Sequence, residues 1–379
     1  MHFTKFETNI EVTTLAALWA HDGMTRRALG TELGLSRPTI ERALQSLTNK
    51  GFIASSESNA PNRGRPATVF HVREDAWLTL GMDFELPEVN LVLTNTRGRI
   101  LHQKQFEVRQ NLNNPRRALD RLANTLHGWL GGLDDDACSV ENIAGLGIGV
   151  PGFLTSNGVS FVGRNLPNWE QVPVKEYLEE RLHFPVLIQH DVHLMALAEI
   201  EHRRWSQGIV LFVSVRPGLE NDLRIGAAIG MAGRVFVGGH GNGGALYQAV
   251  VEAKDLEGLS GDARVRQIAE RLAASLTHAI PLIDPNHIVI HAECLGQDER
   301  TLIEYCREAL EKSMHGEYIG VGELVAAAIR GASGAQQAAV SVTRQLLLQP
   351  VAIAGMSGGA GQVAPGTDRS IPDSLGVVK

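Results

Sequence analysis

The chain has 379 residues, 44% of them hydrophobic and 20% charged, which is enough for two or three domains with buried cores. It shows no basic N-terminal region followed by an apolar run and no window of membrane-spanning length, so we expect no export, no membrane insertion and a cytoplasmic location. The net charge of −7 argues against a protein that coats nucleic acid, and three scattered cysteines argue against disulfides or a thiolate zinc site and are expected in the cores.

Charge is distributed unevenly along the chain. Residues 1–70 hold eight Lys or Arg against six acidic residues, a balance of +2, whereas the remainder carries −9. This asymmetry weakly favours a nucleic-acid-binding head at the N-terminus.

The N-terminal segment has the spacing of a helix-turn-helix. Residues 11–23 place apolar side chains at helical intervals, and residues 24–53 predict a short helix, a break at Gly34 and a second helix that starts at Ser36. Ser36 is expected to accept from the free backbone N–H groups at this helix start. The apolar stripe of the second helix is Ile40, Ala43, Leu44 and Leu47.

A second helix in this position meets the major groove of DNA with its N-terminal part. The polar side chains that lie there, off the apolar stripe, are Ser36, Arg37, Thr39 and Arg42. We expect these four residues to contact phosphates or base edges.

Two short strands are expected after the second helix, at residues 52–56 and 68–72, and the segment between them carries Arg63, Gly64 and Arg65 before a proline. By itself, this Arg-Gly-Arg-Pro stretch is typical of a solvated turn. After a helix-turn-helix it predicts the wing of a winged helix. Its arginines would enter a narrow A·T-rich minor groove, and Gly64 would let the backbone approach closely.

From residue 73 onward, apolar runs alternate with amphipathic helices, which indicates α/β layers with a ligand cleft at the carboxyl ends of the strands. The expected strands include residues 90–95, 145–152, 185–191, 209–215, 224–230 and 287–293. The expected helices include residues 117–130, 174–182, 192–205 and 262–280. Composition predicts a flexible tail from residue 351, so the expected domains are residues 1–72, 73–350 and 351–379.

The stretch from residue 145 to residue 199 resembles the central signature of the ROK family of sugar kinases and sugar-responsive repressors. Its most specific parts are residues 147–152, residues 165–169, and Asp191 with Glu199. The resemblance implies an actin-like, hexokinase-like two-lobed domain. A winged helix with a Gly-Arg-Pro wing separates the family's regulators from its kinases, and such regulators are homo-oligomers that bind palindromic operators in double-stranded DNA.

Three nucleotide-binding elements of the kinases are altered in this chain. The first phosphate turn, Asp-x-Gly-Gly-Thr in the family, continues from Asp83 as Phe-Glu-Leu-Pro. The second glycine-rich loop contains Arg216, Pro217 and two acidic residues, and a late Gly-Gly pair is replaced around Ala292. Because phosphates need bare backbone N–H groups, we expect no phosphoryl transfer from ATP and no enzyme activity.

The sugar and zinc positions of the family are altered in part. The resemblance aligns the sugar-binding glutamate with Ala245 and the sugar- and zinc-binding histidine with Gln248, and the zinc-binding cysteine cluster is absent. We therefore expect no metal and no cofactor. His240, without such partners, is expected to be a loop or cleft histidine.

Asn165 and Asp191 match family positions that hydrogen-bond sugar hydroxyls, and Asp191 is the catalytic base in the kinases. From the residues alone, Asp191 fits equally well as the cap of the helix that follows it. His190, with His193 one turn along, is expected to line the cleft, although the pair also fits a pH-sensitive or metal site. The candidate ligand contacts are therefore Asn165, His190 and Asp191.

These features favour a DNA-binding transcriptional regulator that responds to a sugar or related metabolite. We expect it to be a repressor. One alternative is a regulator whose second domain no longer binds sugar and serves as a platform for oligomerisation or a protein partner. The other is a sugar kinase with an added head, which the altered phosphate loops disfavour.

Overall fold

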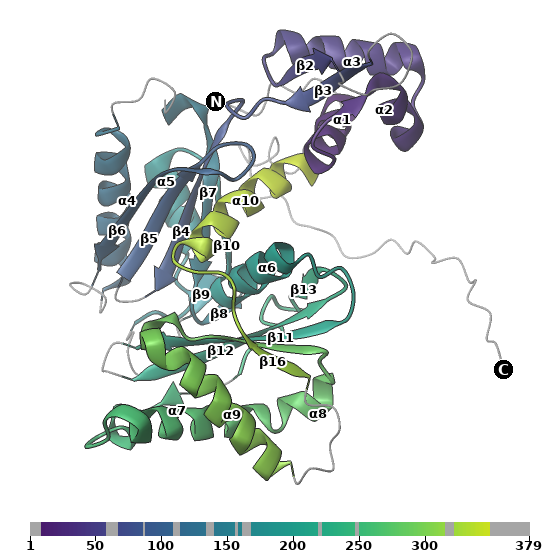
Figure 1. The fold of residues 1–379 in the computed structure, drawn as a ribbon. Helices are drawn as coiled ribbons and strands as arrows, with labels where there is room; N and C mark the ends of the chain where they lie inside the picture. The colour runs from purple at the N-terminus through teal and green to yellow at the C-terminus, as the bar shows by residue number, and fades with distance from the viewer. Residues whose placement is uncertain are drawn as a thin grey trace, which may run out of the picture.

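The computed structural model describes residues 9–57, 67–85, 88–108, 114–133, 140–155, 158–160, 168–218, 222–246, 250–314 and 322–348. An N-terminal head is followed by two lobes, each built on one β-sheet (Figure 1). Within these residues, none of the helices combines the length and the apolar character needed to cross a bilayer. The predicted tail, residues 351–379, lies outside the described residues, and the predicted domain boundaries stay predictions.

The head is a winged helix, as predicted. Its elements are α1 (Asn9–Ala20), β1 (Met24–Thr25), α2 (Arg26–Leu33), α3 (Arg37–Asn49), β2 (Ile53–Glu57) and β3 (Thr68–Val72). The strands form an antiparallel sheet in the order β1-β3-β2. The predicted apolar stripe of α3 is buried against α1 and α2, and Gly34 ends α2 in the left-handed conformation that glycine adopts at low cost.

Ser36 occupies the N-cap position of α3, but the predicted side-chain cap is wrong. Its hydroxyl pairs with the hydroxyl of Thr39, 2.8 Å away, and makes no bond to a backbone N–H. A capping oxygen accepts from the second or third helical residue. Here the second is Pro38, which has no N–H, and the N–H of Thr39 already donates to the Ser36 carbonyl.

The first lobe is a five-stranded sheet in the order β10-β7-β4-β5-β6. Strands β10, β7 and β4 are parallel, whereas β4, β5 and β6 form an antiparallel meander. Its elements are β4 (Leu78–Glu85), β5 (Glu88–Thr94), β6 (Ile100–Glu107), α4 (Pro115–Leu130), η3 (Val140–Asn142), β7 (Ile143–Val150), β8 (Phe153–Thr155), β9 (Gly158–Ser160), α5 (Val174–Leu182) and β10 (Val186–His190). Trp169 is 1% exposed in the core of this lobe.

The second lobe is a six-stranded sheet in the order β13-β12-β11-β15-β16, with β14 paired to β12. Its elements are β11 (Ile209–Pro217), β12 (Leu223–Met231), β13 (Arg234–Phe236), β14 (Val250–Val251), η4 (Ala253–Asp255), α7 (Gly261–Leu276), α8 (Ala279–Ile283), β15 (His287–His291), η5 (Glu293–Asp298), α9 (Glu299–Ser313) and β16 (Glu323–Ala326). The helix expected over residues 262–280 is two helices. Pro281 has no N–H to donate back to Thr277, so α7 stops at Leu276 and α8 starts anew.

Two helices, α6 (Asp191–Arg203) and α10 (Ser333–Leu348), pack against each other, α10 on the first-lobe sheet and α6 on the second-lobe sheet (Figure 1). Helix α10 approaches β4 and β7 so closely that only glycine fits beneath it. A Cβ on Gly81 would lie 1.8 Å from the Ala335 carbonyl oxygen, and one on Gly147 would lie 2.0 Å from that of Ala338. This close approach fixes α10 on the first lobe.

The C-terminal half of α10 reaches the head. Leu346 of α10 shares one apolar core with Leu15 of α1 and with Trp77 at the start of the first lobe. Two polar contacts support this junction: Trp19 Nε1 donates to the Thr96 carbonyl at 2.8 Å, and Arg97 donates to the Trp19 carbonyl at 2.9 Å. The head is therefore packed on the first lobe through α1.

The cysteines only partly follow the expectation of core residues. Cys306 is fully buried in the second lobe. Cys294 is exposed, against the prediction; it lies in η5, after the carboxyl end of β15, and its thiol donates to the Val215 carbonyl. Cys138 lies outside the described residues.

Candidate functional site

A cavity of about 150 Å³ lies where β7 and β10 of the first lobe end against β11 and β12 of the second. Its polar wall comes from His190, Asp191, Ser214, Arg216 and Arg224. Asp191 starts α6 at the end of β10, and Arg216 and Arg224 occupy facing positions on β11 and β12. The cavity therefore lies at the carboxyl ends of parallel strands, where an α/β fold places its ligands.

Arg216 joins two buried carboxylates from different parts of the chain. Its Nη1 donates to Asp191 Oδ2 at 3.1 Å, and its Nη2 donates to Asp83 Oδ2 at 3.0 Å. Each of these three residues is at most 5% exposed. A guanidinium held between two carboxylates in this way fixes the ends of β4, β11 and α6 relative to one another.

The two carboxylates respond differently to this environment. Burial raises the pKa of Asp83 above its ordinary value, against the opposing charge of Arg216. Burial also acts to raise the pKa of Asp191, but the hydrogen bond to His190 and the charge of Arg216 together outweigh it and hold that pKa below its ordinary value. Asp191 is thus a stabilised anion whose affinity for a proton is weak.

Asp191 is not a simple helix cap. The helix includes Asp191 itself, and its Oδ1 accepts from the adjacent Val192 N–H at 2.7 Å while Oδ2 receives Arg216. His190 Nδ1 lies 3.1 Å from Asp191 Oδ1. The carboxylate therefore contacts three neighbours at the cavity wall, so Asp191 does more than cap the helix.

His190 and His193 stack with ring centroids 4.9 Å apart. His190 lines the cavity, whereas His193 Nε2 bonds the Gly243 carbonyl at 2.7 Å, and burial lowers the pKa of His193. Within the described ranges, no group of three residues of metal-ligating type comes together. This arrangement fits the expected polar lining of the cleft, and His240 is exposed on its loop.

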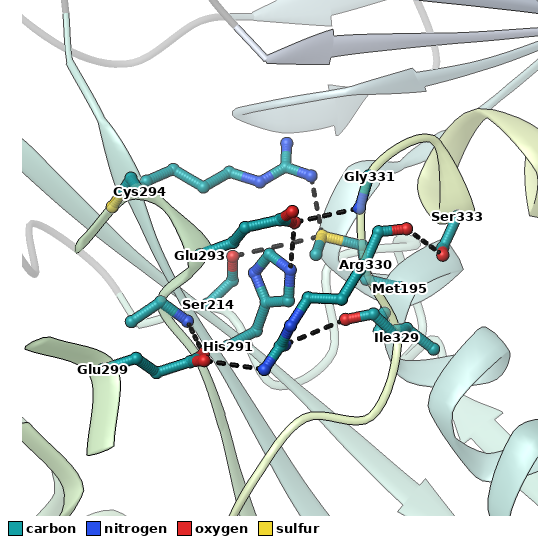
Figure 2. Close-up of polar contacts among 12 residues, drawn as sticks. Met195, Ser214, His291, Glu293, Cys294, Glu299, Ile329, Arg330, Gly331 and Ser333 are labelled. Atoms are coloured by element: carbon teal, nitrogen blue, oxygen red, sulfur yellow. Dashed lines mark hydrogen bonds and ion pairs between the residues drawn. The ribbon is translucent and has the colours of Figure 1, made fainter. Parts of the chain in front are cut away.

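At the end of β15, where the kinases carry their late glycine pair, acidic side chains bond to neighbouring segments (Figure 2). Glu293 accepts from the Gly331 N–H at 2.9 Å, and Glu299 accepts from the Ala292 N–H at 2.8 Å and from Arg330 at 2.7 Å. Burial and nearby arginine charges lower the pKa of His291 to about 3, so this histidine is neutral at physiological pH.

Glu199, part of the family signature, contacts distant parts of the chain. It is completely buried, and its carboxylate accepts from the backbone N–H groups of Ala328 and Ile329 at 2.9 and 3.0 Å and pairs with Arg203. These contacts tie α6 to the segment that connects β16 with α10. Glu199 is therefore an anchor between elements.

The exposed N-terminal part of α3 presents the predicted DNA-facing side chains. Ser36, Arg37 and Arg42 are exposed and Thr39 is half-buried. Arg42 Nε lies 3.4 Å from the Pro38 carbonyl, which leaves most of its guanidinium directed outward. The remaining predicted contacts, Arg63, Gly64, Arg65 and Asn165, lie outside the described residues.

Sequence reasoning identified Asp191 and His190 but missed the two arginines of the cavity. In the sequence, Arg216 stands out only as an alteration of a phosphate loop, and Arg224 belongs to no recognisable motif. The usable signal is register: the two arginines lie at paired positions of adjacent antiparallel strands, so they face each other across β11 and β12.

Comparison with known families agrees with the two-part organisation. Residues 79–252 match the ROK family, and residues 8–72 match the family described as sugar-specific transcriptional regulator TrmB. These matches confirm the resemblance that the sequence motifs indicated.

Two relatives illustrate the likeness in sequence. The xylose repressor of Caldicellulosiruptor bescii is 22% identical over 234 residues, which cover 61% of this chain and 56% of that protein. The DNA-binding transcriptional repressor Mlc of Escherichia coli is 28% identical over 170 residues, which cover 44% of this chain and 40% of that protein. The matches thus span about half the length of these relatives.

A solved structure shares the fold of both parts. It is the crystal structure of a ROK family transcriptional regulator, described as a homologue of the E. coli Mlc protein. The TM-score is 0.64 at 18% identity, and the alignment covers 92% of this chain and 100% of that one. The predicted winged helix followed by an actin-like, hexokinase-like two-lobed domain is confirmed.

Proposed function

We propose that this chain, which carries a ROK family domain over residues 79–252 and a TrmB-type head over residues 8–72, is a sugar-responsive, DNA-binding transcriptional repressor without kinase activity. In this proposal α3 reads operator DNA through Ser36, Arg37, Thr39 and Arg42, and the wing residues Arg63, Gly64 and Arg65 add minor-groove contacts. The effector binds the cavity, with His190, Asp191 and Asn165 as contacts.

The observation that carries the proposal is an unbroken line of packing from the cavity to the head. Helix α6 begins at Asp191 in the cavity wall, and its Glu201 pairs with Arg344 and accepts from Gln337 of α10 at 2.7 Å. Helix α10 in turn packs on α1. A ligand that shifts the start of α6 acts on α10 and so on the head, which is the physical requirement for coupling two sites.

The same cavity is unsuited to phosphoryl transfer. A general base works best when its pKa lies near the operating pH, whereas Arg216 and His190 hold the pKa of Asp191 low. Arg216, which belongs to the altered phosphate loop, also donates to Asp191 Oδ2, and Glu293 stands at the end of β15 where the kinases carry glycine. These contacts support a domain that recognises a ligand and does not phosphorylate it.

We expect no hexose-dependent release of ADP when the purified protein is incubated with ATP, Mg²⁺ and a panel of hexoses. A coupled pyruvate kinase assay, with a commercial hexokinase as positive control, makes this measurement. Hexose-dependent ADP release that disappears in Asp191→Asn would show that the protein is a kinase and would overturn this part of the proposal.

Arg42→Ala is expected to weaken binding to an operator by about 1–3 kcal/mol and to relax base preference in the half-site, because a guanidinium in the major groove reads base edges. Fluorescence anisotropy with an operator selected from random DNA measures this loss. Arg300→Ala, which removes the same charge from an exposed position on α9, is the control and should bind as the parent does. Equal affinity of both variants would place α3 outside the DNA interface.

The remaining parts of the proposal concern assembly. Two heads on one palindromic operator require at least a dimer, since each recognition helix reads one half-site. Sedimentation at the concentrations used for DNA binding checks this, and a monomeric complex with operator would contradict it.

A further inference from the structure

We propose that Asn242 is a positioning residue that latches the effector cavity shut by holding two of its walls together, one from each lobe. The latch is the pair of hydrogen bonds between the Asn242 carboxamide and the backbone of Leu154. A small molecule enters or leaves the cavity when this latch releases. This role rests on the proposed function in one respect, since it takes the cavity as the effector site, and it adds a residue that controls access to that site.

The carboxamide of Asn242 pairs with the backbone of Leu154 as a neighbouring strand would. Its Oδ1 accepts from the Leu154 N–H at 2.8 Å, and its Nδ2 donates to the Leu154 carbonyl at 2.9 Å. Both distances are those of well-formed hydrogen bonds. Leu154 lies in β8 of the first lobe, whereas Asn242 follows β13 of the second lobe, 88 residues further along the chain. The two bonds therefore join the lobes.

Leu154 presents its backbone groups to Asn242 because of its place in the ladder with β9. It is directly opposite Val159, and Val159 bonds Val172 on its other side through both its N–H and its carbonyl. The N–H and the carbonyl of one residue in an antiparallel ladder point the same way, so Leu154 directs both of its groups away from β9. A carboxamide has a donor and an acceptor side by side and complements this pair.

The segment that carries Asn242 is held in a fixed shape. The N–H of Gly243 donates to the Val237 carbonyl at 2.8 Å, which closes residues 237–243 on themselves. A Cβ on Gly243 would lie 2.6 Å from the Phe236 carbonyl oxygen, so only glycine fits at this closure. The Gly243 carbonyl is bonded by His193 of α6 at 2.7 Å. Asn242 is therefore positioned for the latch, which lowers the conformational cost of forming it.

The latch lies beside two walls of the cavity. Phe153 directly precedes Leu154 and lines the cavity from the first lobe, whereas Ala245 and Leu246 line it from the second lobe shortly after Asn242. With these walls together, the cavity measures about 150 Å³ and His190 in its wall is only 7% exposed. Separation of the walls would open the cavity to solvent, so the latch controls access to it.

The strength of the latch suits a contact that both holds and releases. Leu154 and Asn242 are half-buried, so water can replace each hydrogen bond when the walls separate. Because protein and water compete for the same groups, two such bonds shift an opening equilibrium by roughly 5- to 150-fold. The cavity is then closed most of the time and still opens.

The test is the rate at which diethyl pyrocarbonate, a small reagent that acylates imidazole, modifies His190 in the full chain. The reagent must enter the cavity to reach His190, whereas His127 and His202 are exposed and serve as internal references. Mass spectrometry of peptides gives the rate at each histidine. We expect Asn242→Ala to raise the His190 rate by at least about fivefold and to leave both reference rates unchanged.

Hydrogen exchange at the Leu154 amide gives a second measurement, because Asn242 Oδ1 is its acceptor. Asn242→Ala should speed exchange in the peptide that contains Leu154. Asn242→Asp keeps an acceptor for the Leu154 N–H but has no donor for the Leu154 carbonyl, so it should also modify at His190 faster than the parent.

Asn286→Ala is the matched control. Asn286 Oδ1 accepts from the Ile209 N–H at 2.7 Å, so this variant also loses a bond between a side chain and the backbone. Ile209 starts β11, whereas the cavity lies at the other end of that strand. Asn286→Ala should therefore keep the parental rate at His190. Circular dichroism spectra that match the parent confirm that each variant is folded.

Three results would overturn the proposal: a His190 rate in Asn242→Ala within about twofold of the parent, an equal rise in Asn286→Ala, or unchanged exchange at Leu154. An Asn242→Asp variant that reacts as slowly as the parent counts equally against it. Operator binding by the same preparations tests the proposed function separately. A parent that binds its operator but gives one of these results contradicts only the latch, whereas a parent that binds no DNA contradicts the proposed function.

Discussion

Arg216→Met is expected to lower the free energy of unfolding by about 3–5 kcal/mol, the usual cost of removing one partner from a buried ion pair. Without the guanidinium, Asp83 and Asp191 remain buried, and each loses the donor that compensates its desolvation. Urea unfolding followed by circular dichroism at pH 7 measures the change, provided that the slope with denaturant stays constant.

The control for Arg216→Met separates lost charge from lost packing. Combining it with Asp83→Asn and Asp191→Asn neutralises the uncompensated carboxylates and should recover a substantial part of the lost stability. A change below about 1 kcal/mol in Arg216→Met alone would mean that water reaches these carboxylates freely and would contradict the buried ion-pair arrangement.

Gly147→Ala is expected to cost about 3 kcal/mol or more, because overpacking against a backbone that cannot rotate away is at the upper end of such effects. The added Cβ would lie 2.0 Å from the Ala338 carbonyl oxygen and 2.5 Å from its carbonyl carbon. Helix α10 must then leave the sheet, and since α10 also contacts α1, we expect operator affinity to fall together with stability.

Gly128→Ala is the matched control for Gly147→Ala. Gly128 lies in α4 of the same lobe, and nothing would lie within 4 Å of its Cβ. This variant should be neutral or more stable by up to about 1 kcal/mol, because alanine has the higher helix propensity. Equal stability of Gly147→Ala and the parent would show that α10 does not pack on β7 as described.

Local sequence patterns predict most of the fold. The stripe of Ile40, Ala43, Leu44 and Leu47 repeats at helical spacing over about two helical turns, so α3 could be placed before any tertiary contact was known. The Ser36 cap was wrong for a reason also visible in the sequence, since Pro38 lacks the N–H that the cap would need. The break before α8 likewise follows from Pro281.

The chemistry of the cavity could not be predicted in the same way. Asp83 and Arg216 are 133 residues apart, and their contact depends on the juxtaposition of two sheets that no local period encodes. Asp191 matches a contiguous family motif and His190 directly precedes it in the chain, whereas Arg224 matches none. Glu199 belongs to the same motif, but its burial against Ala328 and Ile329 depends on the distant segment before α10.

Sequence-specific DNA binding by α3 is the central claim of the proposed function. Selection of bound sequences from a random double-stranded DNA pool by the purified full chain measures it. We expect enrichment of an inverted repeat with half-sites about one helical turn apart, or a multiple of that, and loss of the enrichment in an Arg37→Ala, Arg42→Ala double variant. No enrichment over the starting pool, or the same inverted repeat recovered by the double variant, would contradict the account.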